Sequence, residues 1–168
     1  MHKNFRLYSI VAGGYLSALQ AGLQTAHAVA DLSILKDSSH QFKGGVGEWK
    51  FQEWAQQDKT IVILSAFNSK GVADAFERLK PFAKKFSLPS VIFHEDEDSL
   101  AGAATAAAII VPECYWNTSF KRGRTFLEDF YESYQETEGE LVLEQIFIKG
   151  TVEFEFIELL KSYKLYSS

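Results

Sequence analysis

The chain has 168 residues, of which 46% are hydrophobic and 14% aromatic, enough apolar material for one buried core and too much for an intrinsically disordered protein. Its formal net charge of −5 means that any nucleic-acid contact needs a local basic patch. No apolar run approaches the ~18 residues of a membrane span, and the single cysteine, Cys114, cannot form an intramolecular disulfide. We therefore expect a single cytoplasmic domain over residues 1–168 with no membrane segment.

The N-terminal segment predicts a buried strand followed by an amphipathic helix. Residues 7–12 form an apolar run that ends at Gly13 and Gly14, which indicates a tight turn with positive backbone φ angles. A phosphate-binding loop is the less favoured interpretation, because the full dinucleotide-binding spacing is absent. Beyond this turn, apolar residues recur at helical spacing and predict an inward-facing stripe made of Leu16, Leu19, Leu23, His27, Ala30 and Ile34.

His27 has two interpretations in this pattern. Its place on the predicted inward stripe favours a histidine that is partly buried in the core. The alternative is an orienting or proton-handling group near a site at the strand ends. Because Gln20, Gln24 and His27 interrupt the apolar run, a helix explains this segment better than a signal peptide does.

The central part of the chain predicts strands that alternate with amphipathic helices. Continuous apolar runs indicate strands that are covered on both faces, so we expect a three-layer α/β/α fold with a mostly parallel, mixed, four-stranded sheet. Asn68 or Ser69 is a candidate cap for the helix that contains Pro81, where a kink or break is expected. The four predicted strands are residues 7–12, 60–66, 90–94 and 105–111, and a short helix is predicted at 48–57, with Trp49 and Trp54 as its anchors.

The last third of the chain predicts an addition to this core over residues 113–155. An aromatic-rich helix is expected at 124–135, followed by a hairpin with strands at 141–148 and 151–156. Residues 157–166 predict a terminal helix or strand.

Aromatic and basic residues lie close together in this addition. Lys121, Arg122 and Arg124, which we call the basic cluster, follow Trp116 at short distance. Such a surface is suited to stacking bases and contacting phosphates of tRNA. The slightly favoured alternative is a loop whose aromatic side chains pack on the core while its cations stay solvated.

Four carboxylates follow the third predicted strand. Because ligands gather at the carboxyl ends of strands in α/β sheets, the run from Glu95 to Asp98 is a candidate divalent-cation site. A solvated acidic loop is favoured, since the spacing is not that of a specific metal site. The sequence contains no phosphate-binding P-loop, zinc-protease or paired-cysteine motif, so no cofactor is expected.

Taken together, several segments resemble the type 2 peptidyl-tRNA hydrolase family. Residues 23–28, Leu-Gln-Thr-Ala-His-Ala, look like the family's Ala-Ala-Gln-x-x-His-Ala helix motif. Residues 54–64 look like its tryptophan-then-strand segment, and residues 76–112 look like its helix, strand, active-site loop and final strand. The tail 159–166 is similar to its C-terminal segment. The resemblance therefore implies a family-like core made of residues 1–112 and 156–168.

The resemblance implies a protein that acts on, or binds, peptidyl- or aminoacyl-tRNA. Gln24, His27 and Thr105 match polar positions of the family, and Asp96 or Asp98 is the candidate replacement for its loop aspartate. His27 and Thr105 would then polarise or position the ester, because hydrolysis needs a placed proton acceptor and a stabilised oxyanion. The basic cluster would replace phosphate contacts that the family makes elsewhere.

The chain departs from the family where the family carries its charges. Ala12, Gly13 and Gly14 occupy the places of a basic and an acidic residue, and Leu19–Ala21 replace a lysine-bearing segment. Residues 94–99 replace an Asp-Ala-Gly-Arg-Thr loop and contain no arginine. Losing cations weakens both catalysis and phosphate binding. The alternative hypothesis is therefore a non-enzymatic binding or regulatory module on the same fold, with the addition as a surface for a protein partner or a homodimer.

Overall fold

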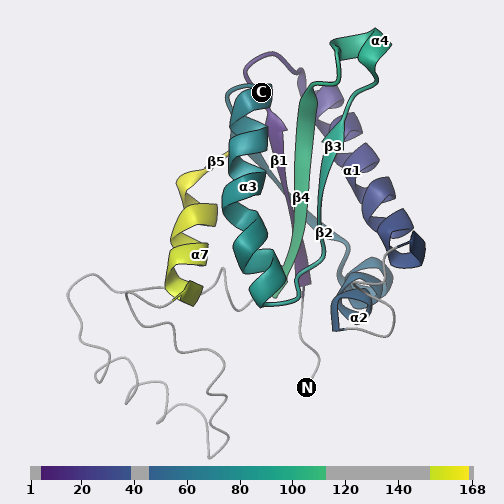
Figure 1. Ribbon diagram of the computed structural model, residues 1–168, viewed down its shortest axis with the longest axis vertical. Helices are drawn as coiled ribbons and strands as arrows, with labels where there is room; N and C mark the ends of the chain where they lie inside the picture. Colours follow the sequence, from purple (N-terminus) through teal and green to yellow (C-terminus); the bar gives the residue numbers. More distant parts are fainter. Residues whose placement is uncertain (1–4, 39–45, 113–151, 167–168) are drawn as a thin grey trace, which may run out of the picture.

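The computed structural model describes residues 5–38, 46–112 and 152–166. Within these ranges, one mixed sheet carries helices on both of its faces (Figure 1). The elements in chain order are β1 (Phe5–Ala12), α1 (Ala18–Ser38), α2 (Val46–Glu53), the π-helical turn η1 (Trp54–Asp58), β2 (Thr60–Ala66), α3 (Ser69–Lys85), β3 (Ser90–His94), α4 (Glu97–Leu100), β4 (Ala104–Pro112), α7 (Val152–Ser162) and β5 (Lys164–Leu165).

The strand order of the sheet is β3-β4-β1-β2-β5. β1 pairs with β2 in parallel and with β4 antiparallel, β3 pairs with β4 antiparallel, and β2 pairs with β5 antiparallel. The strands β1, β2 and β3 consequently share one direction. The predicted α/β fold with a mixed sheet is confirmed. The expectation that the sheet is mostly parallel is wrong, because β1 and β2 form a parallel pair whereas the other three pairings of the described strands are antiparallel. The sheet has five strands instead of four, since the two residues of β5 add to the edge of β2.

The sheet separates two apolar cores. On one face, Tyr8 and Ile10 of β1 pack with side chains of α3 and α7; on the other face, Leu7 and Val11 pack with α1 and the buried indole of Trp54. This alternation along β1 follows from the two-residue period of a strand. β4 is buried along its whole length, as its continuous apolar sequence predicts for a strand that is covered on both sides.

Helix α3 runs without interruption from Ser69 to Lys85, so the break expected at Pro81 does not occur. Pro81 is exposed, whereas Val72 and Leu79 on the opposite face are buried in the core. Of the two predicted caps, Asn68 caps the helix, because its Oδ1 accepts a hydrogen bond of 2.9 Å from the backbone N–H of Gly71, whereas Ser69 is the first residue of α3.

Helix α1 buries a different face from the predicted stripe. Ala21 and Ala28 lie in the core against β4, whereas Leu19, Leu23 and Ile34 are 84%, 53% and 60% exposed. The alanines of β4 give α1 a flat surface, on which small side chains allow the closest packing. Leu19, Leu23 and Ile34 therefore point outward, whereas Leu32, which is not part of the predicted stripe, is buried. The prediction that His27 faces inward is wrong as well, because His27 is exposed.

The turn after β1 contains Gly13 and Gly14, as predicted, but for a different reason. Among the described glycines only Gly102 has a positive φ angle, so the expected left-handed conformation is wrong. A Cβ atom on Gly13 would collide with the Ser65 hydroxyl, and one on Gly14 would collide with the carbonyl of Phe67. The two glycines let the turn lie directly against the end of β2.

The segment 152–156, predicted as a strand, forms the first part of α7. Its alternating sequence favours a strand locally, but Phe156 and Leu160 fall on one helical face and are buried beside α3. Phe156 packs against the rings of Phe82 and Phe86, at centroid distances of 5.3 and 6.1 Å. The expectations for 113–151, namely the helix at 124–135 and the strand at 141–148, lie outside the described residues.

No helix within the described ranges is both long and apolar enough to cross a membrane.

Candidate functional site

The carboxyl ends of β1, β2 and β3 meet at one end of the molecule, the upper end in Figure 1. The turn that follows β1, the residue Phe67 that follows β2 and the acidic segment that follows β3 all lie there. In open α/β sheets this is the edge at which ligands bind. The candidate site residues on α1 and β4 are described relative to this edge.

A buried hydrogen bond joins two residues that the sequence singled out. The Thr105 Oγ1 donates to the Gln24 Oε1 at 2.8 Å, although the two residues are 81 positions apart in sequence. Thr105 has no exposed surface and Gln24 is only 7% exposed. The structure thus brings this pair together, but in the interior of the seam between α1 and the sheet and not on an open wall.

A β-bulge places Thr105 on this side of the sheet. Phe93 pairs with Ala106 and His94 with Ala104, so Thr105 is the extra residue between two consecutive pairs. A bulge re-aims the side chain of its extra residue, which here allows Thr105 to reach Gln24. The sequence predicts the strand but not the bulge, because the bulge depends on the register with β3.

A second buried hydrogen bond, this one between two hydroxyl groups, also joins α1 to the sheet. The Ser9 Oγ of β1 and the Thr25 Oγ1 of α1 are 2.8 Å apart, and both side chains are buried. The sequence analysis did not single out these two residues. Two signals point to them: Ser9 is a polar position inside an apolar strand, and Thr25 directly follows Gln24. Two adjacent polar side chains of α1 are therefore each paired with a hydroxyl of the sheet.

His27 lies at the surface of the same seam. Its imidazole stacks on the ring of Phe93 with centroids 4.9 Å apart and an interplanar angle of 11°. Phe93 pairs with Ala106, the residue next to Thr105. His27 and Thr105 are therefore on the same face of the sheet, with the imidazole exposed and the threonine side chain buried.

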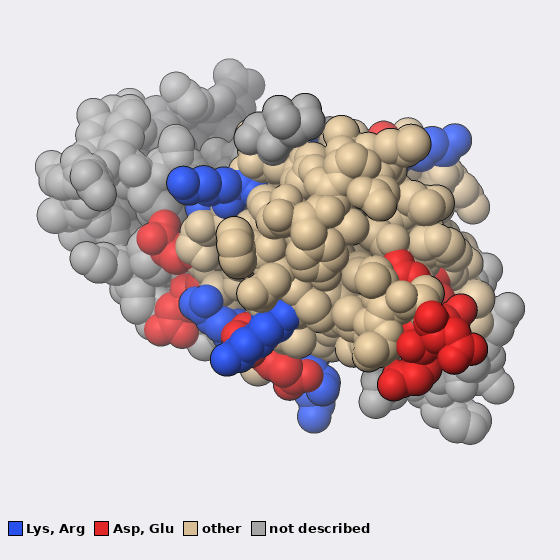
Figure 2. Space-filling view, turned by 90° about the horizontal axis from the view of Figure 1, so that it is seen from above, with Lys and Arg blue, Asp and Glu red and all other residues tan. Residues whose placement is uncertain are grey.

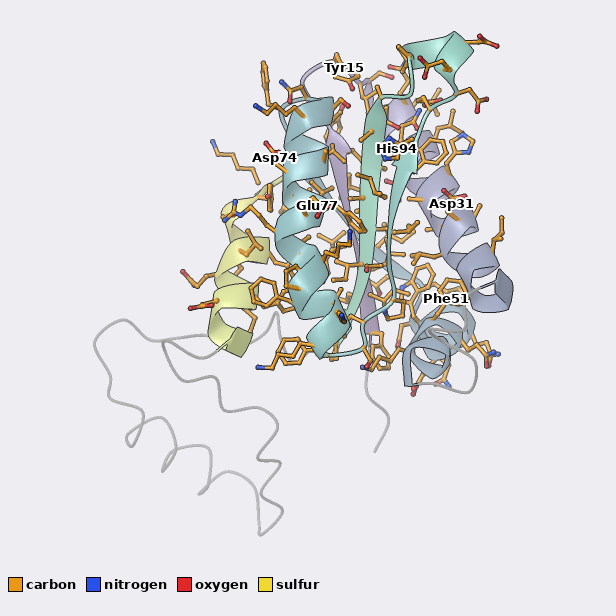
Figure 3. The ribbon with its side chains drawn as sticks, viewed as in Figure 1. Tyr15, Asp31, Phe51, Asp74, Glu77 and His94 are labelled. Atoms are coloured by element: carbon orange, nitrogen blue, oxygen red, sulfur yellow. The ribbon has the colours of Figure 1, made fainter. Side chains whose placement is uncertain are left out.

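Tyr15 and Glu95 lie near each other at the upper end. Tyr15 is 49% exposed, and the partial burial of its side chain, together with the smaller effect of the negative charge of Glu95, raises the pKa of its phenol above the ordinary value. The Nδ1 of His94 lies 3.0 Å from the carbonyl oxygen of Gly102, which closes the acidic segment onto the start of β4. Tyr15 and His94 both lie toward this end of the sheet (Figure 3).

The remaining acidic candidates, Asp96 and Asp98, are exposed and belong to α4 and its preceding residue. No hydrogen bond given for the described residues joins either carboxylate to Gln24, His27 or Thr105. In those same ranges, no three histidine, cysteine, aspartate or glutamate side chains gather as metal ligands would. The acidic segment, residues 95–98, is therefore a negatively charged surface beside the seam between α1 and the sheet.

The view from above shows this negatively charged surface directly (Figure 2). Carboxylates gather on the side where Figure 1 places α4, and the centre of the visible face carries no charge. Near α4, the described surface therefore presents negative charge to a ligand. The predicted phosphate contacts of the basic cluster, together with Trp116, lie outside the described residues.

The seam combines an exposed imidazole, that of His27, with buried hydroxyl groups, those of Ser9, Thr25 and Thr105. The bond from Thr105 occupies the carbonyl of Gln24 and leaves its NH₂ group as the donor. Thr105 itself is sealed from a ligand in this conformation.

Comparisons of the sequence with known proteins do not identify a family for this chain. No protein-family model matches the chain, and no curated protein matches it in sequence. Any functional interpretation must therefore rest on the site residues and their surroundings.

Proposed function

We propose that the protein is a divergent relative of the type 2 peptidyl-tRNA hydrolases that acts on, or binds, the ester-linked end of peptidyl- or aminoacyl-tRNA. The observation that supports this proposal is the 2.8 Å hydrogen bond between Thr105 and Gln24, with His27 one helical turn further along α1. These are the three polar positions that the resemblance singles out, and they meet in one seam although they are distant in sequence.

His27 is the residue that carries the proposed chemistry. Its imidazole is exposed and is held by its stacking on Phe93, so it can accept a proton from a water that attacks the ester. Thr105 acts through Gln24 as a positioning residue, because its hydroxyl is buried and already donates a hydrogen bond. Asp96 and Asp98 border the seam and are available to a ligand.

The charges around the seam favour weak binding of tRNA by the described surface. The carboxylates near α4 repel the phosphates of a tRNA, and this repulsion raises the concentration at which tRNA binds. Phosphate contacts would then come from the basic cluster, Lys121, Arg122 and Arg124.

A cleavage assay with N-blocked aminoacyl-tRNA tests the enzymatic part of the proposal. We expect His27→Ala to lower turnover by about 10²-fold or more, as the loss of a general base does. Ser33→Ala is the matched control, because Ser33 is exposed on the same helix and its hydroxyl bonds only the carbonyl of Ala30. Wild-type turnover no higher than that of a His27→Ala, Thr105→Ala double variant would remove the enzymatic claim.

A salt titration of tRNA binding tests the binding part separately. We expect affinity to fall as salt rises, because phosphate contacts release counterions. Neutralising Lys121, Arg122 and Arg124 together should flatten this dependence. A protein that binds no tRNA even at low salt contradicts the proposed ligand.

The second candidate function is a non-enzymatic binding or regulatory module. The observation that favours it is the complete burial of Thr105, together with carboxylates near α4 where a phosphate ligand needs cations. In this case tRNA or a protein partner binds without turnover, and His27→Ala leaves binding unchanged. Binding and cleavage measured on the same variants therefore separate the two candidates.

A further inference from the structure

Strand β3 is an edge of the sheet. The strand order β3-β4-β1-β2-β5 ends at β3, and within the described ranges only β4 pairs with it. Proteins usually protect an exposed edge with a lysine, an inward-pointing charge, a proline or a very short strand. The five residues of β3, Ser-Val-Ile-Phe-His, include no lysine, carboxylate or proline, and five residues is an ordinary strand length. The outer side of β3 is therefore able to pair with another extended chain.

The register of β3 shows which of its backbone groups face outward. The carbonyl of Pro89 accepts a hydrogen bond of 2.9 Å from the backbone N–H of Ile110. Because bonded and non-bonded residues alternate along an antiparallel ladder, Val91 also bonds to β4, whereas Ser90 and Ile92 do not. The N–H and C=O groups of Ser90 and Ile92, which we call the open edge of β3, therefore point away from the sheet.

The open edge lies beside the residue that carries the proposed chemistry. Phe93, on which the His27 imidazole stacks, directly follows Ile92. At the usual rise of a strand, the stretch from Ser90 to Phe93 is about 10 Å long, and His27 lies at its carboxyl end. A chain that pairs with the open edge lies in the plane of the sheet, whereas His27 lies over one face of it. Pairing therefore leaves the imidazole accessible.

We propose, on the basis of the hydrolase function proposed above, that the open edge of β3 binds the peptide of peptidyl-tRNA as an additional strand. The ester is at the carboxyl end of this peptide, and His27 is near the carboxyl end of β3. The peptide consequently runs parallel to β3, with its ester next to His27. About three or four extended residues cover the stretch from Ser90 to Phe93.

The chemistry of the open edge selects a peptide among the parts of such a substrate. Backbone N–H and C=O groups side by side are matched by another extended backbone, which offers both a donor and an acceptor at alternate residues. The phosphates of tRNA offer acceptors only. Hydrogen bonds to a backbone also read no side chain, so the open edge suits a substrate whose peptide sequence varies.

A series of substrates that differ only in peptide length is the first test. The series is N-acetylated aminoacyl-, dipeptidyl-, tetrapeptidyl- and hexapeptidyl-tRNA, with the same tRNA and the same C-terminal residue. We expect kcat/KM to rise by about 10- to 100-fold between one residue and four, through backbone hydrogen bonds, and to change little beyond four. Polar and apolar tetrapeptides should be cleaved at similar rates.

Methylation of single backbone nitrogens in the tetrapeptidyl substrate tests the pairing itself. In a strand that pairs on one side, the N–H groups of alternate residues point to the partner strand. An N-methyl group should therefore lower kcat/KM by about tenfold at one set of alternate residues and have little effect at the other set. A surface that binds the side chains of the peptide does not produce this alternation.

Ser90→Pro tests the edge from the side of the protein. It removes one outward N–H group at the first position of β3, where proline is tolerated. The ratio of kcat/KM between the tetrapeptidyl and the aminoacyl substrate should fall by about fivefold. Ile61→Pro is the matched control, because the Tyr166 N–H bonds to the Ile63 carbonyl and the N–H of Ile61 therefore also faces outward, but from β2. This control should keep the wild-type ratio, and urea unfolding checks that both variants are folded.

The outcomes distinguish this inference from the proposed function. Cleavage that is independent of peptide length and of methylation overturns the strand pairing and leaves the hydrolase proposal intact. A protein that cleaves none of these substrates removes both. A dimer of the full chain that sedimentation detects and that Ser90→Pro dissociates would show that the open edge pairs with a second copy, and would overturn the inference.

Discussion

Thr105 is the residue on which the seam between α1 and β4 depends. It is the extra residue of a β-bulge, and its hydroxyl donates a hydrogen bond to the side-chain carbonyl of the buried Gln24. In Thr105→Val the shape is kept, but the Gln24 Oε1 loses its donor. Leaving a buried acceptor without its hydrogen bond costs about 1–3 kcal/mol.

We therefore expect urea unfolding to show Thr105→Val destabilised by that amount. Combining it with Gln24→Leu should recover part of the loss, because both polar groups are then removed. Ser9→Ala, which removes one hydroxyl of the neighbouring pair, serves as a comparison. Strictly additive effects of Thr105→Val and Gln24→Leu would show that the bond contributes nothing to stability.

Tyr15 gives the protein a dependence on alkaline pH. Its pKa is raised by burial and by Glu95, so the folded protein holds the phenolic proton more tightly than the unfolded chain does. The contribution of the protonated Tyr15 phenol to the free energy of unfolding is fully present below the ordinary tyrosine pKa of about 10. It is lost as pH rises through the raised pKa of the folded protein.

The free energy of unfolding of the wild type should consequently fall more steeply above about pH 10 than that of Tyr15→Phe. Glu95→Gln should reduce this difference without abolishing it, because burial is the larger cause. Urea unfolding at a series of alkaline pH values measures both effects. Parallel pH profiles for wild type and Tyr15→Phe would contradict the assignment.

At the scale of elements, strands were easier to predict than helix faces. The bounds of β2 and β3 match the predicted residues 60–66 and 90–94, because each is an apolar run between clear turn signals. The face of α1 was predicted wrongly because apolar residues occur on both of its sides. Ala21, Ala28 and Leu32, which lie off the predicted stripe, are buried in the core together with alanines of β4.

The site was predictable in part for the same reasons. Its members Gln24, His27 and Thr105 stand out by residue type, but their roles depend on burial, which the pattern assigned incorrectly to His27. The bulge at Thr105 and the pairing of β5 follow from tertiary register. A stretch as short as β5 carries too little periodicity to be recognised in a sequence.

At the scale of the whole molecule, the helices and strands form one continuous layered unit. The C-terminal residues contribute to it, since the Tyr166 hydroxyl donates to the carbonyl of Leu16, 150 positions earlier, at 2.6 Å. The backbone N–H of Tyr166 also donates to the carbonyl of Ile63. The C-terminal residue Tyr166 thus connects the segment after β1, which borders the candidate site, to strand β2.

The central place of β1 also determines how the protein reaches this state. Ile10 pairs with Leu64 on one side and with Ala107 on the other, so its partners are synthesised about fifty and about a hundred residues later. Contacts of such long range make folding slower than in a helical protein of the same size. During translation the apolar strand β1 is therefore without its partners until β2 and β4 have been synthesised, and we expect aggregation of incomplete chains to be greatest in this interval.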